Sequence, residues 1–349
     1  MSQSCQRLTS ELESLKQLKQ TFNQELASLP QTGKSDDLMF IRVVKFRLER
    51  TLQELQNELW LETPELTKEN LKAQYEAQVD LLRKTNLLKT LATGELGIEA
   101  INHQEYPIPT LEQIENKMLK NKEFLKTKIN QGFVKLIIVP FGLPLDSLIK
   151  AYGNSLTKHH QQGKLLDTQD KPLRLREEPI NDWFGCAKAE AKGYLVYFPQ
   201  EYSKTTHQGK TKKQLLATQA WQVLLLEDLP DLPGEGKGKV LAGRKQPEAN
   251  KSPNDYLKQL QTDPQYKGEQ GLTLESWLVY ALTHLTQTDQ VIDDWQGSGK
   301  ACCLLNSYFK SSSVPDADFS RDSETVDLYQ STPGDPSSDD SVRFAVSIL

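Results

Sequence analysis

Leucines and other apolar residues recur at intervals of three and four along the first part of the chain. One stripe covers residues 8–29 and a second covers residues 41–59, with Pro30 and Gly33 between them. This spacing places the apolar side chains on one face of an α-helix, and proline and glycine favour a turn. The sequence therefore predicts two helices that fold back as an antiparallel pair. Their apolar seams either pack only on each other or also bind a partner helix.

Two more helices are predicted before residue 131. One begins near Thr67 and extends to about Leu88, and the other covers Leu111 to about Ile129. Together with the first pair, they indicate a helical bundle or coiled-coil hairpin over residues 1–131.

The pattern changes at residue 132, where strands begin to alternate with helices. Residues 133–140 are short, apolar, rich in β-branched side chains and ended by Pro140, which is typical of a buried strand. Further strands are predicted at 193–199 and 221–226, and further helices at 145–156, 211–219 and about 299–309. We therefore expect a second, mixed domain over residues 132–349 and an α+β fold class for the chain.

The clearest single element begins at Thr273. Threonine is a favoured N-cap because its hydroxyl accepts a hydrogen bond from the first helical turn. The residues that follow repeat with the helical period: Leu274, Trp277, Leu278, Ala281, Leu282 and Leu285. This pattern predicts a strongly amphipathic helix.

The end of the chain combines a polar stretch with an apolar one. Residues 314–341 are rich in Asp, Ser, Pro and Gly, and Arg321 is their only base. Residues 342–349 are mostly apolar and predict a terminal strand. Because that strand must return to the core to bury its apolar face, we expect residues 314–341 to form an irregular loop displayed on the surface.

Composition narrows the classes of function. A chain of 349 residues is long enough for two or three folding units. The net charge of -5 argues against a general nucleic-acid binder, which needs a dense positive surface. The four cysteines, Cys5, Cys186, Cys302 and Cys303, have no metal-binding CxxC spacing, so we expect reduced, buried thiols.

No segment has the continuous apolar character of a secretory signal or a membrane span. The longest apolar run, residues 136–139 with Phe141, is too short to cross a bilayer. We expect a cytoplasmic protein without membrane or nucleic-acid partners. Export without a leader is the alternative.

Motif searches find no complete catalytic, nucleotide or metal site. The segment from Gly209 to Thr211 resembles the end of a phosphate-binding loop, but the glycine five positions earlier is missing. The five histidines lack the i, i+4 spacing that aims two imidazoles at one zinc ion. Asp293 and Asp294 fit turn carboxylates better than an acid–base pair. We therefore expect no cofactor and no enzyme activity.

Several motifs between residues 132 and 349 resemble a family of uncharacterised proteins from small-genome bacteria. They are Trp221-Gln222-Val223-Leu224-Leu225, Gly243-Arg244-Lys245-Gln246, Tyr266-Lys267-Gly268-Glu269, Trp277 with Thr283-His284-Leu285, Val291-Ile292-Asp293-Asp294-Trp295 and Val342-Arg343-Phe344-Ala345-Val346. Members of this family look like the variable proteins that diversity-generating retroelements target. The terminal motif is similar to the strand that closes C-type-lectin-like and formylglycine-enzyme-like folds. Ser341 stands where such proteins often carry a glycine.

The resemblance implies a lectin-like part over residues 255–349, with a variable tail at 314–341. Adenine-directed mutagenesis would place variable, ligand-binding residues at Asp316, Asp318, Ser320, Asp327, Tyr329, Ser331, Asp335, Ser337, Ser338 and Asp340. The fixed neighbours Val314, Pro315, Phe319 and Arg343 would hold the scaffold. Short polar side chains and tyrosine supply adaptable hydrogen bonds and rigid contact area, as in antibody loops.

We therefore expect a ligand-binding protein that displays a diversified polar C-terminal surface to a protein or other ligand with exposed basic groups. Three alternatives remain open. The first is that the tail is an acidic loop without a partner. The second is that the chain is a structural or assembly protein that oligomerises through its N-terminal helices. The third is an enzyme with a nonlocal site, which a deep pocket lined by perturbed titratable residues would favour.

Overall fold

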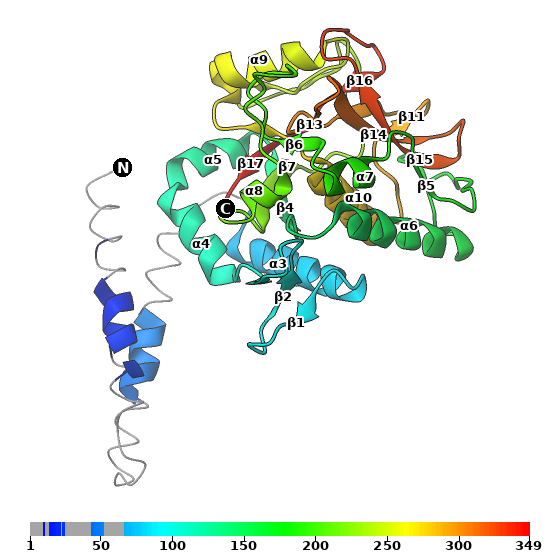
Figure 1. The fold of residues 1–349 in the computed structure, drawn as a ribbon. Helices are drawn as coiled ribbons and strands as arrows, with labels where there is room; N and C mark the ends of the chain where they lie inside the picture. The colour runs from blue at the N-terminus through cyan, green and yellow to red at the C-terminus, as the bar shows by residue number, and fades with distance from the viewer. Residues whose placement is uncertain (1–9, 11–13, 22, 25–42, 52–65) are drawn as a thin grey trace.

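The structure is a computed structural model that describes residues 10, 14–21, 23–24, 43–51 and 66–349 (Figure 1). Within the two predicted N-terminal helices, residues 14–21 and 43–51 are helical. Lys19 Nζ and Glu49 Oε1 form an ion pair of 4.0 Å between them. The remaining parts of both apolar stripes lie outside the described residues.

From residue 66 onward, the helices predicted to begin near residues 67, 111, 145 and 273 are confirmed, whereas the helical segments at residues 186–191, 253–262 and 264–266 were not predicted. They are α3 (Lys68–Lys84), α4 (Leu111–Lys120), α5 (Lys122–Asn130), α6 (Leu145–Gln161), α7 (Cys186–Ala191), α8 (Lys212–Leu215), α9 (Pro253–Thr262), the 3-10 turn η1 (Pro264–Tyr266) and α10 (Leu274–Thr288). Thr67, Thr110 and Thr273 cap α3, α4 and α10 through their side-chain oxygens. The predicted helix over 111–129 is interrupted at Asn121, and the one at 211–219 is reduced to α8.

A four-stranded antiparallel sheet holds the end of the chain. Its order is β10 (Gln270–Gly271), β17 (Phe344–Ser347), β7 (Gln222–Glu227) and β4 (Phe133–Val139). Leu225 of β7 pairs with Leu136 on one side and Val346 on the other. The predicted terminal strand is therefore confirmed, and it lies inside the sheet rather than at its edge.

Polar contacts join the segment before residue 131 to this sheet. Gln74 and Gln78 of α3 accept hydrogen bonds from the backbone N–H groups of Leu136 and Ile138, on the open edge of β4. The Gln74 amide also donates to Val134 O, and the Gln78 amide donates to Thr283 Oγ1 of α10. Helix α3 thus covers a strand edge that would otherwise expose unpaired backbone groups.

A second, six-stranded sheet carries the polar segment. Its main path is β16 (Asp340–Ser341), β12 (Ala301–Cys303), β14 (Val314–Ser320), β15 (Thr325–Ser331) and β5 (Ile180–Asp182), and β11 (Asp294–Trp295) pairs with β14. The smaller sheets are β1 (Lys89–Thr90), β2 (Leu96–Glu99) and β3 (Glu105–Pro107); β6 (Leu195–Tyr197) with β13 (Ser307–Phe309); and β8 (Val240–Leu241) with β9 (Arg244–Lys245).

Two predictions about the C-terminal part are wrong. Residues 299–309 form strands β12 and β13 instead of a helix. Every residue from 301 to 309 is buried, so no alternation of buried and exposed positions distinguishes a strand from a helix here. Residues 314–331 form an antiparallel β-hairpin instead of an irregular loop. The strands at 89–107 were not predicted either.

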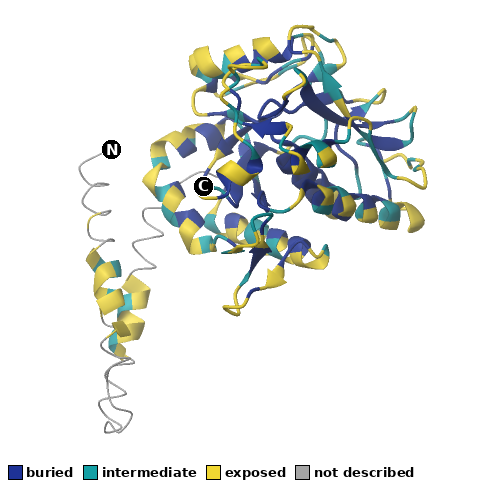
Figure 2. Ribbon diagram, in the orientation of Figure 1, coloured by how far each residue is buried: buried dark blue, intermediate teal, exposed yellow. Residues whose placement is uncertain are grey.

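One hydrophobic core extends from Leu66 to Ile348 and receives residues from α3, α4 and α5 as well as from both larger sheets (Figure 2). The α+β class is confirmed, whereas the division into two domains at residue 131 stays a prediction. Cys186, Cys302 and Cys303 are free and buried, as expected, and Cys5 lies outside the described residues. None of the helices in the described ranges is both long and apolar enough to cross a membrane.

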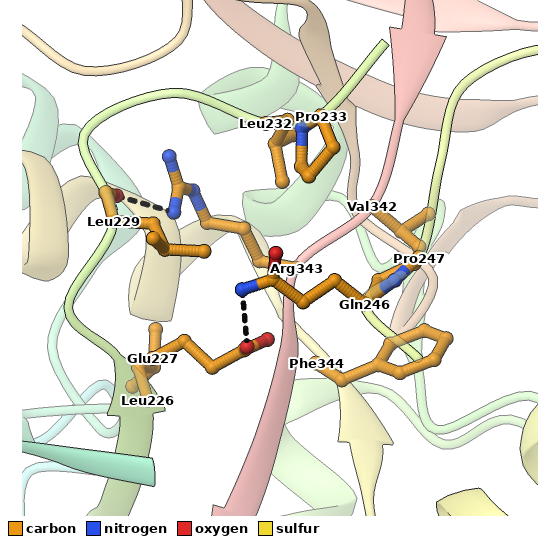
Figure 3. A pocket seen from close by; sticks show the side chains of 10 residues that line it. All are labelled: Leu226, Glu227, Leu229, Leu232, Pro233, Gln246, Pro247, Val342, Arg343 and Phe344. Carbon is orange, nitrogen blue, oxygen red and sulfur yellow. Dashed lines mark hydrogen bonds between the residues drawn. The ribbon is translucent and has the colours of Figure 1, made fainter. Parts of the chain in front are cut away.

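Arg343, just before β17, fixes the end of the chain to three other segments. Its guanidinium donates to both carboxylate oxygens of Asp293, at 3.1 Å from Nε and 2.5 Å from Nη2. It also donates to the carbonyl oxygens of Leu229 (Figure 3) and Pro230, each at 2.7 Å. Trp277 of α10 donates to Asp293 Oδ2 at 2.8 Å. Burial raises the pKa of Asp293 to about 6, and Arg343 opposes the rise, so the carboxyl is ionised at neutral pH.

We expect Asp293→Asn to lower the free energy of unfolding by about 3 kcal/mol, because it leaves the buried charge of Arg343 without a counter-charge. Urea denaturation followed by circular dichroism measures this change. Asp335→Asn, at an exposed position, is the control and should leave stability nearly unchanged. Equal effects of the two substitutions would contradict the assigned role.

Candidate functional site

The β14–β15 hairpin has two chemically different faces. Strand periodicity sends alternate side chains to opposite sides of the sheet. Apolar residues of the hairpin are buried in the core: Ala317, Phe319, Val326 and Leu328. The polar residues between them face the other way, and Asp316 pairs across the strands with Tyr329, as Asp318 does with Asp327. The hairpin therefore carries a polar row on a rigid, core-anchored support.

A pocket of about 370 Å³ opens over this polar face. We call it the hairpin pocket. It receives residues from β11, β12, β14, β15 and β16, and from the segments beside β5 and β16. The lining residues are Trp183, Trp295, Ala301, Asp316, Asp318, Asp327, Tyr329, Gln330, Ser331, Asp339 and Asp340. Its volume lies within the range of small-molecule sites.

Asp318 on the pocket floor has an unsatisfied carboxylate oxygen. The residue is 6% exposed, and its Oδ2 is buried without a hydrogen-bond partner. Burial raises the pKa of Asp318 well above its usual value, and Asp316 and Asp327 raise it further. Buried polar atoms in folded proteins are nearly always hydrogen-bonded, so an orphaned oxygen that lines a pocket marks a position for a ligand donor.

Asp316 and Asp340 share one hydroxyl group. Ser331 Oγ lies 2.6 Å from Asp316 Oδ2 and 3.0 Å from Asp340 Oδ2. Burial raises the pKa of Asp316 to about 8, with Asp340 and Asp327 adding to the rise and the Ser331 hydrogen bond opposing it. Burial also raises the pKa of Asp340. The pair therefore favours a protonated state near neutral pH.

Asp327 is positioned differently from these three carboxylates. Its oxygens accept hydrogen bonds from Thr325 Oγ1 at 2.6 Å and from Ser323 Oγ at 3.1 Å. It also stands directly across from Asp318 in the strand pairing, and this proximity is one reason why the ionised form of Asp318 is disfavoured. Ionisation of both carboxyls would be a local cost that a positive group in the pocket would relieve.

Aromatic side chains form the rim. Trp183 is 57% exposed and Tyr329 is 48% exposed, and their rings meet edge to face with centroids 6.5 Å apart. Phe184 packs on Tyr329 at 4.9 Å. Exposed aromatic side chains beside a polar pocket are typical of binding surfaces.

The structure brings most of the predicted ligand-binding residues together. Asp316, Asp318, Asp327, Tyr329, Ser331 and Asp340 line the pocket. Ser320, Asp335, Ser337 and Ser338 do not. Ser320 is buried at the end of β14, and the other three lie in the segment that connects β15 to β16. The four predicted scaffold residues, Val314, Pro315, Phe319 and Arg343, are all buried.

Sequence reasoning missed Trp183, Trp295 and Asp339. The strand pairing of β5 and β11 brings the two tryptophans to the hairpin from distant positions in the chain. The hairpin itself had a signal, because polar and apolar residues alternate strictly at 316–319 and 326–329. Ser341 has no positive φ angle, so its backbone does not require a glycine at this position.

A second cavity lies beside Arg343 and has a volume of only about 10 Å³ (Figure 3). Gln246 beside it donates to Glu227 Oε1 at 2.8 Å. A space of this size holds no more than a single water molecule. It belongs to the packing around Arg343 and is not a ligand site.

Among the residues that the structure describes, no group of three or more His, Cys, Asp or Glu residues is arranged to hold a metal ion. Burial raises the pKa of Cys302 and Cys303 well above the usual value, which disfavours the reactive thiolate. Comparisons with protein-family models, with curated proteins and with solved structures found no significant match.

We expect the stability of the protein to fall as pH rises through the pKa of Asp316. The folded carboxyl keeps its proton up to about pH 8, whereas the unfolded carboxyl loses it near 3.8, so the folded state binds more protons between these values. The group therefore stabilises the fold fully below the unfolded pKa and loses this contribution towards the folded pKa. Asp316→Asn should remove this dependence.

Chemical denaturation at a series of pH values measures the effect. The free energy of unfolding of Asp316→Asn, relative to that of the unmodified protein, should increase as pH rises from about 5 to about 8.5. Asp335→Asn, the exposed control, should follow the unmodified protein at every pH. A constant difference between Asp316→Asn and the unmodified protein would contradict the assignment.

Proposed function

We propose that this chain is a ligand-binding protein whose ligand-contacting surface is the hairpin pocket. The observation that carries the proposal is Asp318 Oδ2, a buried oxygen without a hydrogen-bond partner in a pocket of about 370 Å³. The aromatic rim and the core-anchored hairpin support it, because recognition sites combine adaptable polar groups with rigid aromatic contacts.

The proposal includes diversification of this surface. We infer that the chain resembles the variable proteins of diversity-generating retroelements and carries a C-type-lectin-like C-terminal part. Two features are consistent with this. The terminal strand β17 pairs with β7 inside the four-stranded sheet. Six of the residues assigned to variation line the pocket: Asp316, Asp318, Asp327, Tyr329, Ser331 and Asp340. Their neighbours in the strands face the core and would have to stay constant.

Sequencing the gene across many cells of its source population tests this proposal. Substitutions should concentrate at the six pocket positions, while the interleaved core residues Ala317, Phe319, Val326 and Leu328 stay constant. These core residues are the internal control, since they occupy the same strands. An invariant tail, or substitutions spread equally over both faces, would overturn diversification.

A second candidate function is catalysis in the same pocket. The raised pKa of Asp316, about 8, provides a carboxyl that holds a proton at neutral pH, as a general acid must. A catalytic acid has to be kept in every cell. The sequencing experiment therefore separates the two functions, because variation at Asp316 is compatible with recognition and not with catalysis.

A third candidate is assembly through the N-terminal helices, in the form of a bundle or coiled-coil hairpin. The observation in its favour is that Leu18, Val43 and Phe46 are 56%, 45% and 65% exposed. Apolar side chains exposed along paired helices are typical of an oligomer interface.

If this candidate is correct, the protein should sediment as an oligomer and Leu18→Glu with Phe46→Glu should convert it to a monomer, because charges in an apolar seam oppose association. Analytical ultracentrifugation measures the mass. Gln17→Glu, at an exposed polar position, is the control and should remain an oligomer. A monomeric unmodified protein would exclude this function.

A further inference from the structure

The charges of the hairpin pocket are strongly unbalanced. Five carboxyl groups line it: Asp316, Asp318, Asp327, Asp339 and Asp340. Among the described residues, one of these carboxyls forms an ion pair: Lys300 Nζ lies 3.3 Å from Oδ1 of Asp339, which is exposed. The carboxyls of Asp316 and Asp327 accept hydrogen bonds from hydroxyl groups, and Asp318 Oδ2 has no partner.

The contacts of Ser331 constrain the protons in the empty pocket. A serine hydroxyl has one hydrogen and can donate it to only one acceptor at a time. Ser331 Oγ nevertheless lies within hydrogen-bond distance of both Asp316 and Asp340. If both carboxylates were ionised, the hydroxyl would donate to one of them, and its oxygen would face an oxygen of the other with no hydrogen between them. A proton on one carboxyl provides that hydrogen, because the carboxyl O–H can then donate to Ser331 Oγ.

The orphaned oxygen of Asp318 adds an independent requirement. It needs a donor from outside the chain, and it faces Asp327 across the strand pair. A neutral donor would satisfy the oxygen but would not offset the effect of Asp316 and Asp327, which disfavour the ionised form of Asp318. A positively charged N–H donor satisfies both, since charge-assisted hydrogen bonds to carboxylates are the stronger class.

The walls of the pocket favour an organic cation. Trp183, Trp295 and Tyr329 line it together with the carboxyls. Cations are attracted to the faces of indole and phenol rings, and the apolar stem of a basic side chain packs on such rings. The carboxyls are spread over β14, β15 and β16 instead of converging on one point, which agrees with the lack of a metal-holding group among the described residues.

We propose that the hairpin pocket binds the ammonium or guanidinium end of a lysine or arginine side chain presented by a basic peptide segment. This cation displaces the proton that one carboxyl of the Asp316–Asp340 pair holds in the empty pocket. The inference rests on the proposed function and specifies its ligand. The carboxyl O–H bond breaks, the proton passes to the solvent, and the side-chain cation keeps its own protons. No bond in the ligand changes.

Proton displacement makes the binding pH-dependent. The groups around Asp316 on the pocket face are Asp318 on its own strand, Asp327, Tyr329 and Ser331 on β15, Asp340 on β16 and Cys303 on β12. All of them are neutral or negative, so none supplies a competing positive charge. Because the pKa of Asp316 is about 8, a cation competes with a proton at neutral pH.

Isothermal titration calorimetry of the full chain tests the proposal with three capped peptides: tri-lysine, tri-arginine and Nε-acetylated tri-lysine. The acetylated peptide has nearly the same shape and lacks the charge. At least one cationic peptide should bind about tenfold or more tightly than the acetylated one, since a buried charge pair is worth at least that factor. The preferred cation identifies the side chain. Equal binding by all three, or by none, overturns the proposal.

Buffers of different ionisation enthalpy measure the proton. Binding near pH 7 should release at least about one proton per peptide, and affinity should fall by about tenfold for each pH unit below the pKa of Asp316. Asp316→Asn should release about one proton fewer than the unmodified protein. Binding to the unmodified protein without proton release overturns the displacement step.

Two variants locate the binding in the pocket. Asp318→Asn should weaken the binding of the cationic peptide by about tenfold or more. Asp327→Asn is a second variant for the same floor, and Asp335→Asn, outside the pocket, is the control that should bind normally. Circular dichroism verifies that each variant is folded. Unchanged affinity in both floor variants overturns the assignment, and so does Ca²⁺ binding that excludes the peptide.

These outcomes are separate from those of the proposed function. Failure of all peptides to bind, together with variation at the six pocket positions, would reject the cation and leave the binding surface in place. An invariant tail with charge-dependent peptide binding would do the reverse and reject diversification alone.

Discussion

A buried guanidinium needs a carboxylate and several oxygen acceptors close by, and Arg343 finds them in segments that are distant in the sequence. Asp293 comes from the turn before β11, and the two carbonyl groups come from the loop after β7. Trp277 holds the same carboxylate from α10. Since Asp293 also adopts a positive φ of 53°, the contacts with Arg343 and Trp277 hold a backbone conformation that the chain would otherwise avoid. The placement of β17 between β7 and β10, and of β11 beside the hairpin, depends on this group.

The hairpin pocket lies next to the segments that Arg343 and Asp293 hold together. Strand β11 supplies Trp295 directly after the clamped turn and pairs with β14, which carries Asp316 and Asp318. The hairpin therefore tolerates features that a flexible loop would relax, including an orphaned carboxylate oxygen and two facing aspartates. Proteins commonly accept such local conflicts where they bind or react, and stability elsewhere compensates for them.

The elements that could be predicted are those whose pattern is complete within one segment. Helix α10 follows from the Thr273 cap and its apolar stripe, and β4, β7 and β17 follow from short apolar runs. Residues 301–309 were mistaken for a helix because their burial on all sides removes any period. The hairpin was mistaken for a loop because its polar composition was given more weight than its alternation. Trp183, Trp295 and the unsatisfied oxygen of Asp318 depend on strand pairings between distant segments, which no local pattern encodes.

The alternation of the hairpin has a consequence for how the molecule can change. Core and pocket residues occupy neighbouring codons, yet their side chains belong to separate environments, so the chemistry of the pocket can be rewritten without a repacking of the interior. A library randomised only at the outward-facing positions of β14 and β15 would keep every interior contact of Ala317, Phe319, Val326 and Leu328. The hairpin is in this sense a scaffold whose binding chemistry can evolve without a change in the packing of the core.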